Sequence, residues 1–213
     1  MAKVMIEQLV VASANPGKLR EFERLLEPLG VKVCSQSSLG VAPAPEPHET
    51  FVENALAKAR HASAQTGLPA LADDSGICVP ALALAPGVHS ARYAAAQAGQ
   101  SQDALNNDKL IQALANQTDR RAYYVAVLVL VLHAADPLPV IAQGLWFGEV
   151  AKTPRGENGF GYDPYFWLPD LGATAGELDA VQKNAVSHRG QAMRSLMAQI
   201  EARDLLAPTS PQR

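Results

Sequence analysis

The hydrophobic pattern at the start of the chain predicts a strand followed by a helix. Leu9–Ala12 is an unbroken apolar run, as in a short buried strand. Asn15 and Pro16 suit the N-cap and the first position of a helix, and Gly30 suits its end. Between them, apolar residues recur at helical spacing: Leu19, Phe22, Leu25, Leu26 and Leu29. Residues 31–33 then predict a second strand.

A proline-rich, acidic stretch at residues 40–49 predicts a loop before the second helix. Thr50 is a suitable N-cap for that helix, and Glu53 follows at the spacing of a capping box. The helix is predicted to end near Thr66. A short apolar strand at residues 70–72 comes next, and two carboxylates follow it directly.

The rest of the chain alternates between helices and longer strands. The pattern predicts a loop at 86–93, a helix at 102–116, a hairpin of strands at 121–133 and 139–151, and a Gly-rich loop at 153–164. A last helix is predicted to begin after its cap at Ser187 and to end near Leu206, before a frayed tail at residues 207–213. Because helices and strands interleave, we expect an α/β fold with a mixed sheet, formed as a single domain by residues 1–206.

Composition and charge exclude several classes of function. Of the 213 residues, 48% are apolar and 18% are charged, as in an ordinary globular protein, and the formal net charge is −3. Proteins that bind a nucleic-acid polymer usually carry a basic excess, so we expect no such partner. The longest apolar run, residues 125–132, is too short to span a bilayer, and the N-terminus does not resemble a signal peptide. The two cysteines form no disulfide or zinc pattern, and we expect a cytoplasmic protein without membrane contact.

The segment between the first strand and the first helix has the chemistry of a phosphate site. It consists of Ser13, Ala14, Asn15, Pro16, Gly17 and Lys18. Backbone N–H groups of a small-residue loop at a helix N-terminus bind anions, and Lys18 adds a positive charge. The spacing differs from that of a Walker A loop. A capped turn without a ligand is the alternative interpretation.

Carboxylates on either side of the second helix indicate metal and phosphate chemistry. Asp73 and Asp74 stand at a strand end, where adjacent carboxylates are costly unless they meet a metal ion or cations. Ser75 follows them and could bind a ligand oxygen. Because Mg²⁺ prefers one or two carboxylates plus substrate phosphates, Glu46 in the acidic loop could supply the second carboxylate. An acidic turn and a solvated loop charge are the alternatives.

Two later segments offer groups that could bind a base. Residues 156–164 contain three glycines, which let the backbone approach a ligand, with Phe160 as a stacking face and Asp163 as an acceptor for ring nitrogens. The start of the last helix supplies donors from His188 and Arg189, as does Lys183 before it. Positive charge is unfavourable at a helix N-terminus and calls for a compensating anion or base carbonyl. A flexible hairpin loop is the alternative for the first of these segments.

Taken in order, these motifs resemble the inosine/xanthosine triphosphate pyrophosphatase family. The matching segments are residues 13–18 with Glu21, 50–55 with Lys58, 72–76, 86–93, 159–164 and 187–190. The resemblance implies an elongated α/β fold of two lobes around a central mixed sheet, with the nucleotide in the cleft between the lobes, and a homodimer. It also implies the reaction NTP + H2O → NMP + pyrophosphate with Mg²⁺, on non-standard purine nucleotides such as ITP, dITP and XTP.

The resemblance implies a role for each candidate residue. Residues 13–18 and Lys58 would hold the phosphates. Glu46 and Asp74 would bind the metal ion, Asp74 would be the general base for the attacking water, and Asp73 would support them. The remaining candidates would bind the nucleotide and read its base: Ser75, Phe160, Gly161, Tyr162, Asp163, Lys183, His188 and Arg189.

The resemblance leaves alternatives open. Relatives commonly have a glycine before the Thr-Phe pair, and this acidic loop has none, so Glu49 is an alternative to Glu46 as the metal ligand. The position of Glu46 in the loop favours Glu46. A pyrophosphatase of the Maf type, acting on modified or pyrimidine nucleotides, would be expected to lack the motifs at 160–163 and 187–190. A nucleotide-sensing module without turnover has little need for the second of two adjacent carboxylates. The Asp73-Asp74 pair also lacks the D-x-D spacing of a haloacid-dehalogenase phosphatase.

Overall fold

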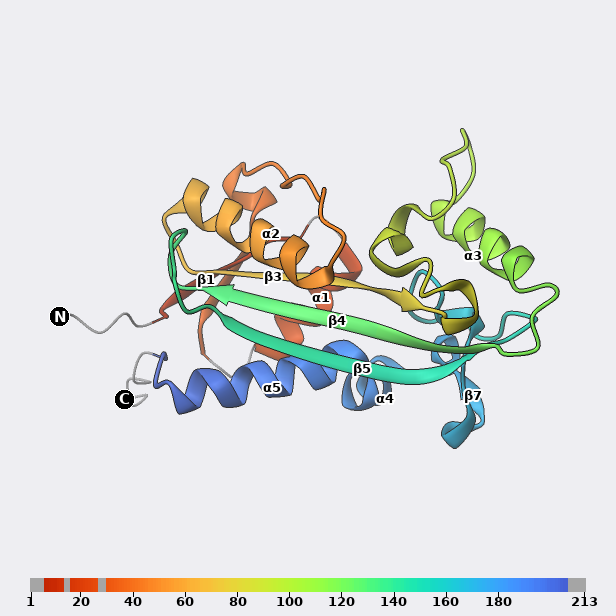
Figure 1. Cartoon of the computed structure of the whole chain (residues 1–213). Helices are drawn as coiled ribbons and strands as arrows, with labels where there is room; N and C mark the ends of the chain where they lie inside the picture. Colours follow the sequence, from red (N-terminus) through yellow and green to blue (C-terminus); the bar gives the residue numbers. More distant parts are fainter. Residues whose placement is uncertain (1–5, 14–15, 27–29, 207–213) are drawn as a thin grey trace. The chain divides into compact units, whose positions relative to one another are not determined.

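The computed structural model describes residues 6–13, 16–26 and 30–206 (Figure 1). Within these residues the strands form one seven-stranded sheet in the order β2-β1-β3-β4-β5-β6-β7. The strands are β1 (Gln8–Val11), β2 (Lys32–Ser35), β3 (Ala70–Cys78), β4 (Arg121–Val131), β5 (Val140–Val150), β6 (Phe166–Leu168) and β7 (Ala173–Thr174).

The sheet is mixed, which confirms the predicted α/β class. β1 pairs in parallel with β2, with Leu9 opposite Val33, and with β3, with Val10 opposite Ala70. β6 pairs antiparallel with both β5 and β7. Parallel strands of one sheet need crossover connections, and the first two helices supply them, α1 between β1 and β2 and α2 between β2 and β3.

The described residues contain five α-helices: α1 (Pro16–Leu26), α2 (Phe51–Thr66), α3 (Gln102–Ala113), α4 (Ala180–Val186) and α5 (His188–Ala202). The predicted N-caps at Thr50 and Ser187 are confirmed, because the Thr50 hydroxyl accepts from the Glu53 N–H at 3.3 Å and the Ser187 hydroxyl accepts from the Gly190 N–H at 3.2 Å. The third predicted N-cap, Asn15, lies outside the described residues. None of these helices has the length and apolar character needed to cross a membrane.

The chain divides into two compact units, each assembled from separate stretches. The first unit comprises the described residues up to Asp74, Val127–Gln143 and the described residues from Ala192 onward. The second comprises Ser75–Ala126 and Gly144–Gln191. β3 passes from the first unit into the second between Asp74 and Ser75.

The core of the first unit forms where α2 packs on the sheet beside β1 and β3 (Figure 1). Ala55, Ala59 and Ala62 recur at helical spacing on α2 and are fully buried. Their small side chains let the helix approach the sheet closely. This packing fixes the face of α2 that carries Asn54 and Lys58.

The core of the second unit is rich in aromatic rings. Tyr124, Trp146, Tyr162 and Phe166 are all buried in one cluster. The rings of Tyr124 and Phe166 lie 4.5 Å apart between centroids, a distance typical of favourable aromatic pairs. This cluster supports the segments that hold the candidate base-binding residues.

Several predicted boundaries are wrong. β3 does not end at the carboxylates but continues through them to Cys78. The last helix ends at Ala202, because Asp204 adopts a left-handed φ of 52° and Leu206 then forms a β-bridge with Ile6. α3 ends three residues earlier than predicted, at Ala113, and α4, β6 and β7 were not predicted at all. The predicted tail at 207–213 lies outside the described residues.

Candidate active site

The first cluster of candidate residues lies in the first unit, on β3, α1 and α2. Asp73 on β3 is buried, and its Oδ2 lies 3.0 Å from the Nζ of Lys18, near the start of α1. The next carboxylate, Asp74, is also buried and pairs with a different lysine. Because neighbouring side chains of a strand point to opposite faces, each carboxylate can meet its own cation. The ion pairs explain how the strand continues through two acidic residues.

Lys58 on α2 joins two carboxylates. Its Nζ lies 2.8 Å from Glu46 Oε1 and 2.9 Å from Asp74 Oδ1. The acidic loop and β3 are thus brought to one point by a single ammonium group. Glu49, the alternative to Glu46, is exposed to solvent. The geometry therefore supports Glu46 as the partner of Asp74.

Asn54, one turn before Lys58 on α2, was not among the predicted site residues. It is fully buried, and its amide donates to the carbonyl of His48 at 3.0 Å and accepts from the N–H of His48 at 3.1 Å. The same Nδ2 donates to Asp74 Oδ2 at 3.3 Å. Asn54 thus fixes the backbone of the acidic loop and one oxygen of Asp74. A polar residue four positions from Lys58, on the same helix face, was the signal in the sequence.

Burial and charge shift the proton affinities of this cluster in a consistent way. Burial raises the pKa of Asp74 above the ordinary value, and the charge of Lys58 offsets this only in part. Burial alone would lower the pKa of Lys58, but the charges of Asp73 and Asp74 and the contact with Glu46 outweigh it, and the pKa is raised. Lys58 therefore stays charged, and Asp74 is a stronger base than an exposed aspartate.

The donor set of this cluster fits a magnesium ion. The described residues contain no group of three or more His, Cys, Asp or Glu side chains with the arrangement of an all-protein metal site. Mg²⁺ needs fewer, because it keeps several waters and is held by one or two carboxylates plus substrate phosphates. Glu46 and Asp74 converge on one cation, the Lys58 ammonium, and could share a second one.

The predicted phosphate segment is described only in part. Ser13 is buried two residues after the end of β1, Pro16 and Gly17 begin α1, and Lys18 pairs with Asp73. Ala14 and Asn15 lie outside the described residues. The segment thus follows a strand and leads into the start of a helix, as an anion site of this kind requires.

The second cluster lies in the second unit and begins with the glycine-rich loop. Gly159 has a φ of 79°, and an added Cβ would lie 2.1 Å from Asp163 Oδ2. Only glycine therefore lets Asp163 turn back under the loop, where its Oδ2 accepts from the Phe160 N–H at 2.8 Å. Tyr162 is buried and donates to the carbonyl of Ser90 at 2.8 Å. The loop is thus an ordered segment rather than a flexible hairpin.

Asp163 is buried and accepts hydrogen bonds from three donors. Besides the Phe160 N–H, its Oδ2 accepts from Lys183 Nζ at 2.6 Å, and its Oδ1 accepts from the Tyr124 hydroxyl at 3.2 Å. Burial raises the pKa of Tyr124 well above the ordinary value, so this hydroxyl remains a donor. Lys183 is held with its Nζ 4.9 Å from the centroid of the Phe160 ring. Asp163 therefore orients both the ring and the lysine that were predicted to meet the base.

The start of α5 supplies the last predicted residues. The His188 ring stacks on Tyr124, with centroids 4.7 Å apart and planes 10° from parallel. Arg189 is almost fully buried and donates from Nη2 to the Ser75 hydroxyl at 3.1 Å. Its guanidinium carbon lies 5.9 Å from the centroid of the Phe160 ring. Phe160, Lys183 and Arg189 are thus brought together by contacts within the second unit.

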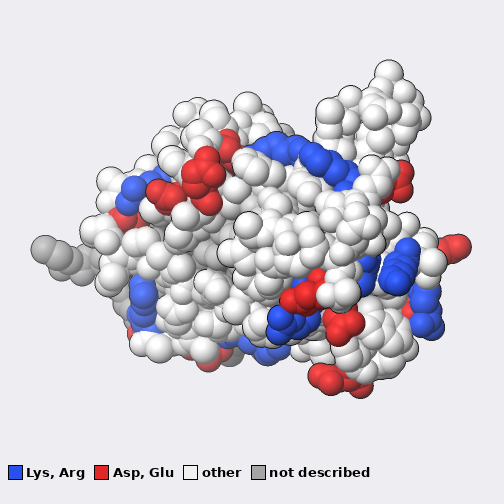
Figure 2. Space-filling view, turned by 45° about the vertical axis from the view of Figure 1, so that its right-hand side comes forward, with Lys and Arg blue, Asp and Glu red and all other residues white. Residues whose placement is uncertain are grey.

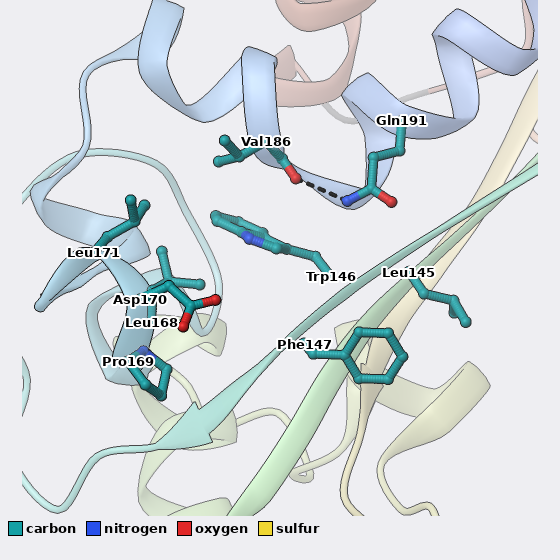
Figure 3. Close-up of a pocket in the computed structure, with 9 residues that line it drawn as sticks. All are labelled: Leu145, Trp146, Phe147, Leu168, Pro169, Asp170, Leu171, Val186 and Gln191. Atoms are coloured by element: carbon teal, nitrogen blue, oxygen red, sulfur yellow. Dashed lines mark hydrogen bonds between the residues drawn. The ribbon is translucent and has the colours of Figure 1, made fainter.

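A separate apolar pocket of about 300 Å³ lies in the same unit (Figure 3). Figure 3 shows the indole of Trp146 between α4 and the loop around Pro169, and the Gln191 amide donates to the Val186 carbonyl at 2.8 Å. Its lining consists of Leu145, Trp146, Phe147, Leu168, Pro169, Asp170, Leu171, Val186 and Gln191. None of the predicted site residues is among them, and the pocket offers few polar groups for a nucleotide.

Several known proteins are similar to this chain over most of its length. The model of the Ham1 family matches residues 9–199. The chain is 60% identical over 195 residues to a dITP/XTP pyrophosphatase of Ralstonia nicotianae, covering 92% of this chain and 97% of that protein. It is 59% identical over 193 residues to a dITP/XTP pyrophosphatase of Burkholderia pseudomallei, covering 91% and 93%. The solved structure of a HAM1 protein from Coxiella burnetii superposes with a TM-score of 0.84 at 48% identity, covering 93% of this chain and all of that one.

Proposed function

The chain belongs to the Ham1 family, and on this basis we propose that it hydrolyses non-standard purine nucleoside triphosphates such as dITP, ITP and XTP. The products are the monophosphate and pyrophosphate, and the reaction clears these nucleotides from the cellular pool. The observation that carries the proposal is the buried Asp74, which shares Lys58 with Glu46. A binding module without turnover would have little need for a second buried carboxylate beside Asp73.

The cluster of the first unit would act on the phosphates. Glu46 and Asp74 would hold Mg²⁺, which when bound neutralises phosphate charge and makes pyrophosphate a better leaving group. Asp74 would accept a proton from the attacking water. Lys18 and Lys58 would stabilise the negative charge that develops on pyrophosphate. Asp73 holds Lys18 in place for this role.

The cluster of the second unit would bind the base. Phe160 offers a stacking face, and Lys183, His188 and Arg189 offer donors. Inosine and xanthine carry a carbonyl at the 6-position, which accepts from such donors, whereas adenine carries an amino group there. Adenine would leave buried donors without a partner, and this selects against ATP.

We place this activity in the cytoplasm and in a homodimer, as the family resemblance implies, with small nucleotides rather than nucleic acid as ligands. On the face shown in Figure 2, Lys and Arg are interspersed with Asp and Glu, and neither sign covers a broad area. That distribution supports local phosphate binding, because a protein that follows the phosphodiester backbone of a nucleic acid needs an extended basic surface.

The pyrophosphatase of the Maf type is disfavoured, because the motifs that it was expected to lack lie within the Ham1 match.

The test is a product assay with separate detection of pyrophosphate and orthophosphate. Purified protein with Mg²⁺ is expected to convert ITP and XTP to the monophosphate and an equal amount of pyrophosphate. Stoichiometric orthophosphate and the diphosphate would overturn the proposed cleavage position. Binding of ITP without turnover would instead support the nucleotide-sensing alternative.

A further inference from the structure

A helix that contains none of the predicted site residues holds the loop that carries Phe160. Asp103 and Asn107 lie one turn apart on α3. Asp103 Oδ2 accepts from the Gly161 N–H at 2.8 Å, and Asn107 Nδ2 donates to the Gly161 carbonyl at 2.9 Å. Both backbone polar groups of Gly161 are therefore bound by one face of one helix.

These bonds fix the backbone on the side of Phe160 that Asp163 does not reach. The N–H of Phe160 donates to Asp163, and the N–H of the following residue, Gly161, donates to Asp103. The two peptide units that flank the Phe160 Cα are thus each held by a carboxylate. Glycines in the loop adopt left-handed dihedrals and carry high conformational entropy when free, so the ring direction depends on these anchors.

The amide of Asn107 is suited to this role and has one orientation. Its Nδ2 donates both to the Gly161 carbonyl and to the Asp103 carbonyl, each at 2.9 Å, and a reversed amide would place oxygen against both carbonyls. The residue is buried, and within the described part of the chain its Oδ1 has no hydrogen-bond partner. A buried acceptor without a partner is destabilising, and proteins tolerate such departures chiefly at functional positions.

We propose that Asp103 and Asn107 are positioning residues for base selection, which set the direction of the Phe160 ring by clamping Gly161. The proposal rests on the proposed function, in which the purine base stacks on that ring. Neither residue needs to touch the nucleotide. Their effect should therefore be on KM and on the preference among bases rather than on the chemical step.

The test uses single variants on α3 of the full chain. Asp103→Ala and Asn107→Leu are expected to raise KM for ITP about 10-fold, with kcat within about 2-fold of the wild type. Asp103→Asn keeps an acceptor oxygen and is expected to restore the wild-type KM. Asp108→Ala removes an exposed carboxylate from the same helix and is the matched control. Asp103 is itself exposed, so Asp103→Ala is expected to fold even where the buried Asn107 variant does not.

A double-mutant cycle with Phe160→Ala separates the effect of clamping Gly161 from the effect of the Phe160 ring itself. If the clamp acts through the ring, Asp103→Ala adds no further change in KM when Phe160 is already alanine. Additive effects, or an Asp103→Ala variant with wild-type KM, would contradict the positioning role of Asp103 and Asn107. Neither result would contradict stacking of the base on the Phe160 ring. An unchanged KM in Phe160→Ala alone would contradict stacking of the base on this ring, and with it this proposal.

Discussion

In the first unit the candidate residues are held together by ion pairs, whereas in the second they are held by hydrogen bonds and ring contacts around the ion pair of Asp163 with Lys183. The first cluster sets three carboxylates, Glu46, Asp73 and Asp74, against two lysines. In the second, Asp163 neutralises Lys183, and the other contacts of Asp163 are an amide and a phenol.

The difference indicates how each cluster can work. The first has one more negative charge than positive among its paired groups, which suits a divalent cation that arrives with a polyphosphate. The second has its ring and its donors held by hydrogen bonds and ring contacts among its own residues. We therefore expect changes in the first cluster to slow all substrates alike, and changes in the second to alter which base is accepted.

Asp74→Asn gives the largest expected effect. The change keeps the size of the side chain but removes the charge that metal binding and proton acceptance both require, so kcat should fall by at least ~100-fold. If the division between the clusters holds, ITP and ATP are slowed by the same factor. Steady-state kinetics on both nucleotides, with thermal unfolding as a check on folding, measure this. A folded variant with wild-type turnover would contradict the assignment of Asp74.

Arg189→Ala should change selectivity instead. In the wild type we expect kcat/KM for ITP and XTP to exceed kcat/KM for ATP roughly 30- to 5000-fold, which corresponds to a difference of about 2–5 kcal/mol in transition-state stabilisation. Removing the guanidinium should narrow this gap by about 30-fold, chiefly by slowing ITP, because ATP never made the bond. Equal efficiencies on ITP and ATP in the wild type would exclude base reading by this helix start.

Local signals made much of this arrangement predictable. The caps at Thr50 and Ser187 and the strand–helix order of the first unit follow from side-chain chemistry within a few residues. The pairs that build the first cluster also follow in part, because two adjacent carboxylates imply cations nearby. Which lysine meets which carboxylate depends on the crossovers of the sheet and could not be read from spacing.

Residues that act through long-range contacts were missed for the same reason. Asn54 meets Asp74 across 20 positions, and Asn107 meets Gly161 across 54. The only local signal for Asn54 is its place four residues before Lys58, and Asn107 has no local pattern that separates it from an ordinary helix-surface amide. The short strands β6 and β7 are likewise determined by pairing with β5 rather than by an alternating run of their own.

The smallest expected effect concerns which glutamate of the acidic loop, Glu46 or Glu49, binds the metal ion together with Asp74. Glu46 Oε1 lies 2.8 Å from the lysine that also binds Asp74, whereas Glu49 is exposed, so only Glu46 is placed to share a cation with Asp74. Glu46→Gln should raise the Mg²⁺ concentration for half-maximal activity about 10-fold, and Glu49→Gln, the matched control in the same loop, should leave it unchanged. Direct titration with Mn²⁺ in the absence of nucleotide gives a readout independent of turnover. The opposite pattern would assign the second carboxylate to Glu49. Unchanged metal dependence in both variants would mean that Asp74 and the phosphates hold the ion alone, and that Glu46 serves only to fix Lys58.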